Sequence, residues 1–304
     1  MLNNIDSIRK DIINHFDPQG RIEGSEVVKL SESGLYYYSC ALFKQKDAKR
    51  NWIVSQIEIW DTEAAVKIFD YLTDNDMSHY NSWWIILSDK HEYLFLAEAQ
   101  TGYSVFDVSN CQLYSFNLED DPFIWMEMHL SPDGTKLVVE GSYWACPGEL
   151  RVYDVANITK LPYPILYRNE FYTRQCGFKF DKWHNNHSFY LQDINNGNIT
   201  TVLIPELEVE IYYLTTEEGG RKTPVRNGYR GQFYYDDCDW DAKQEFINIE
   251  ECAPGQSVRA YLKTLSPEYH HGKFFEGKEF EIREGARVVG KGIVLKVLCS
   301  DFQK

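Results

Sequence analysis

The sequence has no run of about 18 apolar residues, which is the length that a membrane-spanning helix needs. Its N-terminus also lacks the apolar segment of a secretory signal peptide. These two absences predict a cytoplasmic protein that does not span a membrane. The first apolar residues follow helical spacing instead, which predicts an amphipathic helix within residues 1–20. These residues are Ile5, Ile8, Ile12, Ile13 and Phe16.

Cysteine pairs are missing as well. The chain has 7 cysteines, an odd number, and no two of them form a C-x-x-C motif. A disulfide framework or a cysteine-based zinc site is therefore not indicated. The sequence predicts reduced cysteines in the core of a cytosolic protein.

Motifs for nucleotide binding and catalysis are also absent. No G-x-x-x-x-G-K-[ST] loop is present to hold the phosphates of GTP. Neither a G-x-S-x-G elbow nor a Ser-His-Asp spacing occurs. His184, His187, His270 and His271 have no clear set of carboxylates or thiolates beside them, and we expect exposed loop histidines rather than metal ligands. The sequence thus predicts a protein that is not an enzyme and needs no metal or other cofactor.

Acidic residues are unevenly distributed. The net charge is −15, of which residues 1–207 carry −12 and residues 208–304 only −3. The first part should repel nucleic-acid phosphates, whereas the second could present a local basic face. The hydrophobic fraction of 43% supplies enough material for a core.

A repeating pattern occupies the first two hundred residues. Four passages run from an alternating apolar strand through a Ser, Asp or Gly turn into a second strand; they begin at Val27, Trp83, Met126 and Gly177. Three of them are followed by a strand that ends in an aromatic residue and an aspartate: Asp61, Asp107 and Asp154. The aspartates are 46 and 47 residues apart. Such a period is typical of propeller blades, and "LSPDGTKLVV" with "GELRVYDV" resembles a WD-repeat-like blade.

The pattern changes at Glu208. Alternating runs such as "VRAYL" and "VVGKGIVLKVL" predict strands, and Gly-Gly and Pro-Gly pairs predict the turns between them. About six strands in roughly 90 residues favour a small closed barrel, because closure removes exposed edges. We therefore predict an all-β chain: a helix in 1–20, a propeller-like domain of about four blade-like units in 21–205, and a six-stranded β-barrel in 206–304.

The barrel segment carries several motifs in one order. "EEGGRKTP" at 217–224 is followed by "GYRGQFY" at 228–234, by Pro254-Gly255, and by "REGARVVGKG" at 283–292. Over residues 208–298 the chain resembles the third, C-terminal β-barrel domain of elongation factor Tu. No GTP-binding domain and no middle barrel of that factor accompany it, so we do not expect a GTPase.

The resemblance implies a set of binding residues. In the family, the matching positions contact the T-arm of aminoacyl-tRNA, and the barrel also supports contacts with the GTPase domain and the exchange factor. The positions that keep the family residue are Arg221, Arg230, Gln232, Glu284 and Gly285. Arginine forks match phosphate oxygens, and a glutamine side chain or glycine amide can reach a phosphate or a 2′-hydroxyl.

Two departures from the family pattern leave the function open. The family proline after G-Y-R is Gly231, which we expect to free the loop, and "DDCDWD" at 236–241 is predicted to be a solvated acidic loop beside the phosphate path. Arg221, Arg230 and Glu284 could equally form a structural ion-pair network. The charge favours an adaptor that binds a protein of the translation apparatus. The matched residues favour the alternative, a tRNA-binding accessory protein.

Overall fold

The structure, a computed structural model, is all-β as predicted. Among the described residues, helix is limited to α1 (Ile5–His15) and the short 3-10 turns η1 (Pro18–Gly20), η2 (Pro267–Tyr269) and η3 (Ser300–Phe302). None of these helices is long and apolar enough to cross a membrane. The structure describes residues 5–45, 53–73, 82–87, 90–97, 103–116, 123–143, 148–169 and 177–304.

The chain divides into two compact units, and we describe each by itself. The first consists of Met1–Tyr163, Arg168–Lys179 and Asp193–Asn196. The second consists of Pro164–Tyr167, Phe180–Gln192 and Gly197–Lys304. The unit that contains the barrel therefore also includes segments that precede residue 206. The domain limits predicted from the sequence stay a prediction.

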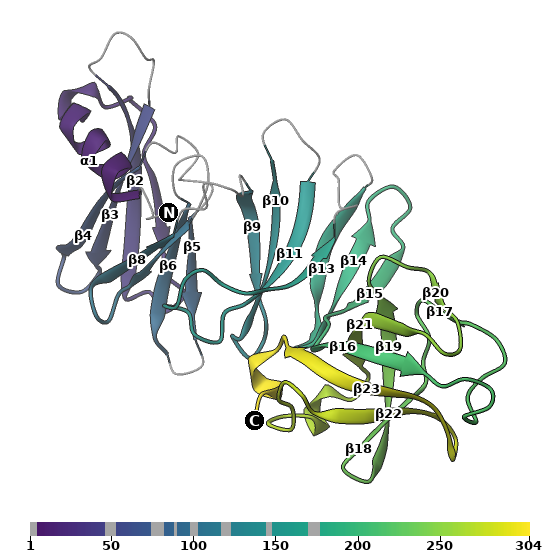
Figure 1. Cartoon of the computed structure of the whole chain (residues 1–304). Coiled ribbons are helices and arrows are strands. Elements are labelled where there is room, and N and C mark those ends of the chain that lie inside the picture. Colours follow the sequence, from purple (N-terminus) through teal and green to yellow (C-terminus); the bar gives the residue numbers. More distant parts are fainter. Residues whose placement is uncertain are drawn as a thin grey trace. The chain divides into compact units, whose positions relative to one another are not determined.

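Each sequence repeat forms its own antiparallel sheet. The sheet orders are β1-β2-β3-β4, β5-β6-β7-β8, β12-β11-β10-β9 and β13-β14-β15, so three sheets have four strands and the last has three (Figure 1). This result agrees with the prediction of about four blade-like units; whether they close into a propeller stays a prediction. The strands are β1 (Val27–Leu30), β2 (Tyr36–Lys44), β3 (Ile53–Asp61), β4 (Val66–Thr73), β5 (Ser82–Ile86), β6 (Glu92–Ala97), β7 (Tyr103–Asp107), β8 (Gln112–Phe116), β9 (Ile124–Leu130), β10 (Lys136–Ser142), β11 (Gly148–Asp154), β12 (Ile165–Asn169), β13 (Phe178–Asn185), β14 (Ser188–Asp193) and β15 (Ile199–Leu203).

The recurring aspartates stabilise the turns that follow their strands. Side-chain oxygens of Asp61, Asp107 and Asp154 each accept a hydrogen bond from a backbone N–H two or three residues later, at 2.7, 3.0 and 3.0 Å. A short carboxylate that bonds its own turn is a common way to fix a tight connection. The aromatic-Asp pattern is therefore explained by the turn geometry of each sheet.

The predicted N-terminal helix forms, and Ile12 and Ile13 within it differ in burial. Ile12 is 1% exposed, whereas Ile13 is 62% exposed. The ring of Phe16 packs edge-on against Phe43 of β2, with centroids 5.0 Å apart. One face of this short helix thus covers the first sheet, and Ile13 lies on the other face.

The second unit contains a closed six-stranded barrel, as the sequence predicts. Its strand order is β16-β21-β19-β18-β22-β23, and a separate two-stranded sheet joins β17 to β20 (Figure 1). In β16 alternate residues from Leu207 to Tyr213 are buried, which is the period-2 pattern of a strand with one side in a core. The strands are β16 (Leu207–Tyr213), β17 (Val225–Arg226), β18 (Gln232–Tyr235), β19 (Cys238–Phe246), β20 (Glu251–Cys252), β21 (Ser257–Thr264), β22 (Glu279–Glu284) and β23 (Arg287–Val297).

The acidic run at 236–241 is not a loop, contrary to the prediction. Only Asp236 and Asp237 form a turn, and both have positive φ, at 48° and 60°. Tyr235 pairs with Cys238 across this turn, so it is a two-residue hairpin in which both central residues are left-handed. The remaining acidic residues of the run belong to β19, because the strand begins directly after the turn.

Two further expectations about side chains are wrong. His187 and His270 are 6% and 0% exposed, so they are buried rather than exposed loop histidines. Cys111 and Cys238 are exposed, whereas Cys40, Cys252 and Cys299 are buried as expected, and none of these five described cysteines forms a disulfide. The two other cysteines, Cys146 and Cys176, lie outside the described residues.

Candidate binding face of the barrel

Arg221 and Glu284 meet on the barrel surface although 63 residues separate them. Arg221 Nη1 forms an ion pair with Glu284 Oε1, and the Tyr229 hydroxyl donates a hydrogen bond to the same oxygen at 2.8 Å. The guanidinium carbon of Arg221 also lies 5.4 Å from the centroid of the Tyr229 ring. Two of the predicted residues are therefore brought together, and their charges neutralise each other.

The double glycine before Arg221 is required by the path of the backbone. Gly219 has φ +95°, and a Cβ atom on Gly220 would lie 1.9 Å from the carbonyl oxygen of Leu214. Arg287 crosses this turn from β23, and its guanidinium donates hydrogen bonds to the carbonyl oxygens of Gly219 and Gly220. This packing fixes the place from which the Arg221 side chain extends.

Arg230 does not join this cluster. Its side chain is exposed and forms no ion pair with any described residue. Tyr229, rather than Arg230, supplies the second donor to Glu284. Sequence reasoning missed this role of Tyr229, although the residue lies within the matched "GYR" motif.

Gly231 does not free the loop, contrary to the prediction. It is buried, and a Cβ atom there would lie 2.7 Å from Ile282 Cγ2 and from Tyr229 Cε1. The adjacent Gln232 is half-buried, and its Oε1 accepts no hydrogen bond from the described residues. Close packing against β22 therefore explains the glycine.

Gly285 has a conformational role in the turn between β22 and β23. Glu284 pairs with Arg287, so Gly285 and Ala286 are the two central residues of a hairpin. Gly285 has φ +61°, which is the conformation that the first central residue of a type II′ turn needs. The turn holds Glu284 at the end of β22, where it reaches Arg221.

Five of the six arginines in residues 206–304 already have polar partners among the described residues. Arg283 stacks on Tyr234, with its guanidinium carbon 3.1 Å from the ring centroid, and forms a 2.5 Å ion pair with Glu281. The other engaged arginines are Arg221 with Glu284, Arg226 with Glu251, Arg259 with Glu208, and Arg287 with backbone carbonyls. Arg230 is left as the arginine best placed to meet a phosphate.

An acidic pocket opens on the outer side of β16, β23, β22 and the β18–β19 turn. Its volume is about 640 Å³, and Tyr212 and Tyr234 are among its lining residues. Its ionisable lining consists of Glu210, Asp236, Asp237, Glu279, Glu281 and Lys291. Asp236 and Glu281 are paired with Lys278 and Arg283, and Asp237 accepts a hydrogen bond from the Tyr234 hydroxyl. Asp237, Glu210 and Glu279 have no ion pair to the described residues. The pocket is suited to a cationic group.

Comparison with known protein families identifies the barrel. Residues 201–298 match the family model of the elongation factor Tu C-terminal domain. The match includes all six barrel strands and the five predicted binding residues, and it covers about a third of the chain. The resemblance seen in the sequence motifs is thereby confirmed for this segment.

Proposed function

We propose that this protein is a non-catalytic cytoplasmic adaptor whose barrel binds a protein of the translation apparatus. The translation context rests on the match of the barrel to a domain of an elongation factor. The observation that favours a protein ligand is the charge of the binding face. Arg221 and Arg283 are held by Glu284 and Glu281, and the pocket presents Glu210 and Glu279 without basic partners among the described residues.

Binding of a phosphate backbone to this face would be electrostatically unfavourable. It would have to displace Glu284 from Arg221 or Glu281 from Arg283, and then lie beside the carboxylates of the pocket. Like charges at a contact cost binding energy and slow association. A lysine or arginine side chain of a protein partner would instead gain carboxylate partners there, with the Tyr212 ring in the same pocket.

The second candidate function is binding of tRNA, and the exposed Arg230 favours it. Purified protein should be titrated with tRNA at low and moderate salt, beside the variant Arg230→Ala. Saturable binding that weakens in this variant, with a salt slope reduced by roughly one unit, would support the tRNA function and contradict the adaptor proposal. We expect weak binding that the substitution does not change.

The adaptor proposal is tested by reversing the charge of two carboxylates in the pocket. The wild type should capture a translation protein from cell extract and should also bind that protein after its purification. The double variant Glu210→Lys/Glu279→Lys should bind it in neither experiment. Glu250→Lys, an exposed acidic residue outside the pocket, serves as the matched control and should keep the partner. Capture that is equal in both variants would refute the assignment of the pocket as the binding site.

A further inference from the structure

Three residues with metal-ligating side chains come together in the second unit. His187 lies in the turn between β13 and β14, His271 follows η2, and Asp301 lies in η3. Their ligand atoms all lie within 4.8 Å of one another. His187 Nε2 is 3.4 Å from Asp301 Oδ2. We propose that His187, His271 and Asp301 form a binding site for a zinc ion.

His187 is held in position before any ion binds. Its backbone N–H donates to Asn185 Oδ1 at 2.8 Å, and its carbonyl oxygen accepts from the Ile204 N–H at 2.9 Å. The imidazole is buried, and its centroid lies 5.7 Å from that of the Phe302 ring. A ligand that is fixed in this way loses little freedom when a metal binds.

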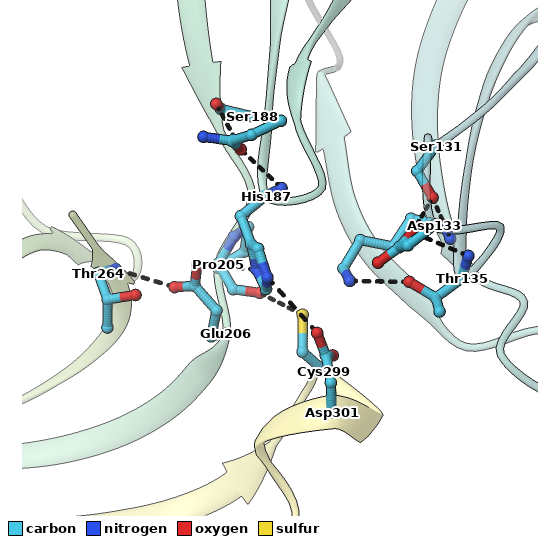
Figure 2. A network of polar contacts seen from close by, with 12 residues as sticks. Ser131, Asp133, Thr135, His187, Ser188, Pro205, Glu206, Thr264, Cys299 and Asp301 are labelled. Atoms are coloured by element: carbon cyan, nitrogen blue, oxygen red, sulfur yellow. Dashed lines mark hydrogen bonds and ion pairs between the residues drawn. The ribbon is translucent and has the colours of Figure 1, made fainter. Parts of the chain in front are cut away.

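A buried carboxylate determines which nitrogen of His187 is available. Glu206 is 0% exposed, and its Oε2 accepts the Thr264 N–H at 2.9 Å. Its Oε1 lies 3.5 Å from His187 Nδ1 (Figure 2). When Nδ1–H faces Glu206, the lone pair of Nε2 points at Asp301, as in the carboxylate–histidine pairs of metal sites. In this tautomer a cation between the Nε2 lone pair and the carboxylate oxygen, which are 3.4 Å apart, would remove their mutual repulsion.

The third ligand gives the site access to solvent. His271 is exposed, and the N–H of the following Gly272 donates to the backbone oxygen of Asp301 at 2.9 Å, which ties the two ligand segments together. Two imidazole nitrogens and one carboxylate oxygen suit Zn²⁺, with water in the remaining position. The competing cation is a proton: an imidazolium at His187 would also bridge Glu206 and Asp301.

Metal titration distinguishes a bound Zn²⁺ ion from a proton on His187. Tag-free, chelator-treated full-length protein is titrated with Zn²⁺ by calorimetry, and with Co²⁺ by visible absorption. We expect one ion per chain for the wild type. His271→Ala and Asp301→Asn should each weaken Zn²⁺ binding by at least about 100-fold while the circular dichroism spectrum is unchanged. No stoichiometric binding by the wild type, or unchanged binding in these two variants, would overturn the proposal and leave the imidazolium bridge as the explanation.

Two further variants test whether Glu206 positions His187 and whether Zn²⁺ binding is specific to this site. Glu206→Gln removes the carboxylate behind His187 and should lower the affinity by about 10- to 100-fold without removing a ligand. His184→Ala is the matched control, because His184 is an exposed histidine of the same hairpin that contacts Tyr190 instead of the site. Equal loss of Zn²⁺ binding in His184→Ala would show non-specific binding to surface histidines and would contradict the site.

Discussion

The ion pair between Lys263 and Glu245 leads to an asymmetric prediction. Lys263 Nζ lies 2.5 Å from Glu245 Oε2, but the two side chains are 5% and 37% exposed respectively. The ammonium also lies 4.9 Å from the centroid of the Tyr167 ring. Lys263 of β21 pairs across the strands with Lys243 of β19. This neighbour is itself a cation and therefore gives Lys263 no second carboxylate partner. The buried cation therefore depends on Glu245 much more than the carboxylate depends on it.

Glu245→Gln should therefore lower the free energy of unfolding more than Lys263→Met does. Removal of one partner of a fully buried pair costs about 3–5 kcal/mol, and the exposure of Glu245 reduces our expectation to about 2 kcal/mol. Lys263→Met keeps the packing of the side chain, leaves Glu245 accessible to water, and loses an attraction to Tyr167 of about 1 kcal/mol. Since it also removes a buried charge, we expect stability within about 1 kcal/mol of the wild type.

Urea unfolding followed by circular dichroism gives both free energies of unfolding. Burial lowers the pKa of Lys263 below its usual 10.5, so at pH values between the folded and unfolded pKa the unfolded chain binds more protons and stability rises with pH. Loss of Glu245 should lower this pKa further. The destabilisation by Glu245→Gln should therefore shrink as the pH rises towards 10.5. If Lys263→Met lowered the free energy of unfolding more than Glu245→Gln, the proposed asymmetry of the ion pair would be refuted.

Three other predictions concern the barrel and the absence of a nucleotide site. Gly220→Ala should destabilise the barrel by more than about 2 kcal/mol in thermal or urea unfolding, because its Cβ would overlap the Leu214 carbonyl oxygen, whereas the exposed Lys222→Ala should have no such effect. Asp237→Gly should raise the free energy of unfolding by about 1 kcal/mol, since glycine adopts φ 60° without strain; a loss would mean that the 3.1 Å hydrogen bond from Tyr234 matters more. Equilibrium dialysis should detect no magnesium-dependent GTP binding, and saturable binding would contradict the sequence argument.

The local patterns in the sequence were sufficient for most strands and turns, although they did not predict the start of β19 in the acidic run at 236–241. Alternation of apolar residues in segments such as Leu207–Tyr213 identified the barrel, and the 46- and 47-residue spacings identified the repeated sheets. These properties depend on residues close together in the chain. For the same reason the Gly-Gly and Pro-Gly pairs could be assigned to turns, while the backbone clearance that requires Gly220 and Gly231 could not.

Contacts between distant segments were decided by the tertiary structure alone. Spacing along the chain does not show that Tyr229 and Arg221 share Glu284, nor that His187, His271 and Asp301 converge. Closure of the barrel sets the first contact, because it places strands that are far apart in sequence beside one another. The second depends on the β13–β14 turn, where His187 contacts Glu206 and Phe302. Burial of His187 follows from the same tertiary contacts. A histidine in a polar "HNNH" stretch therefore gave no sign of being enclosed, although the strands around it were predicted correctly.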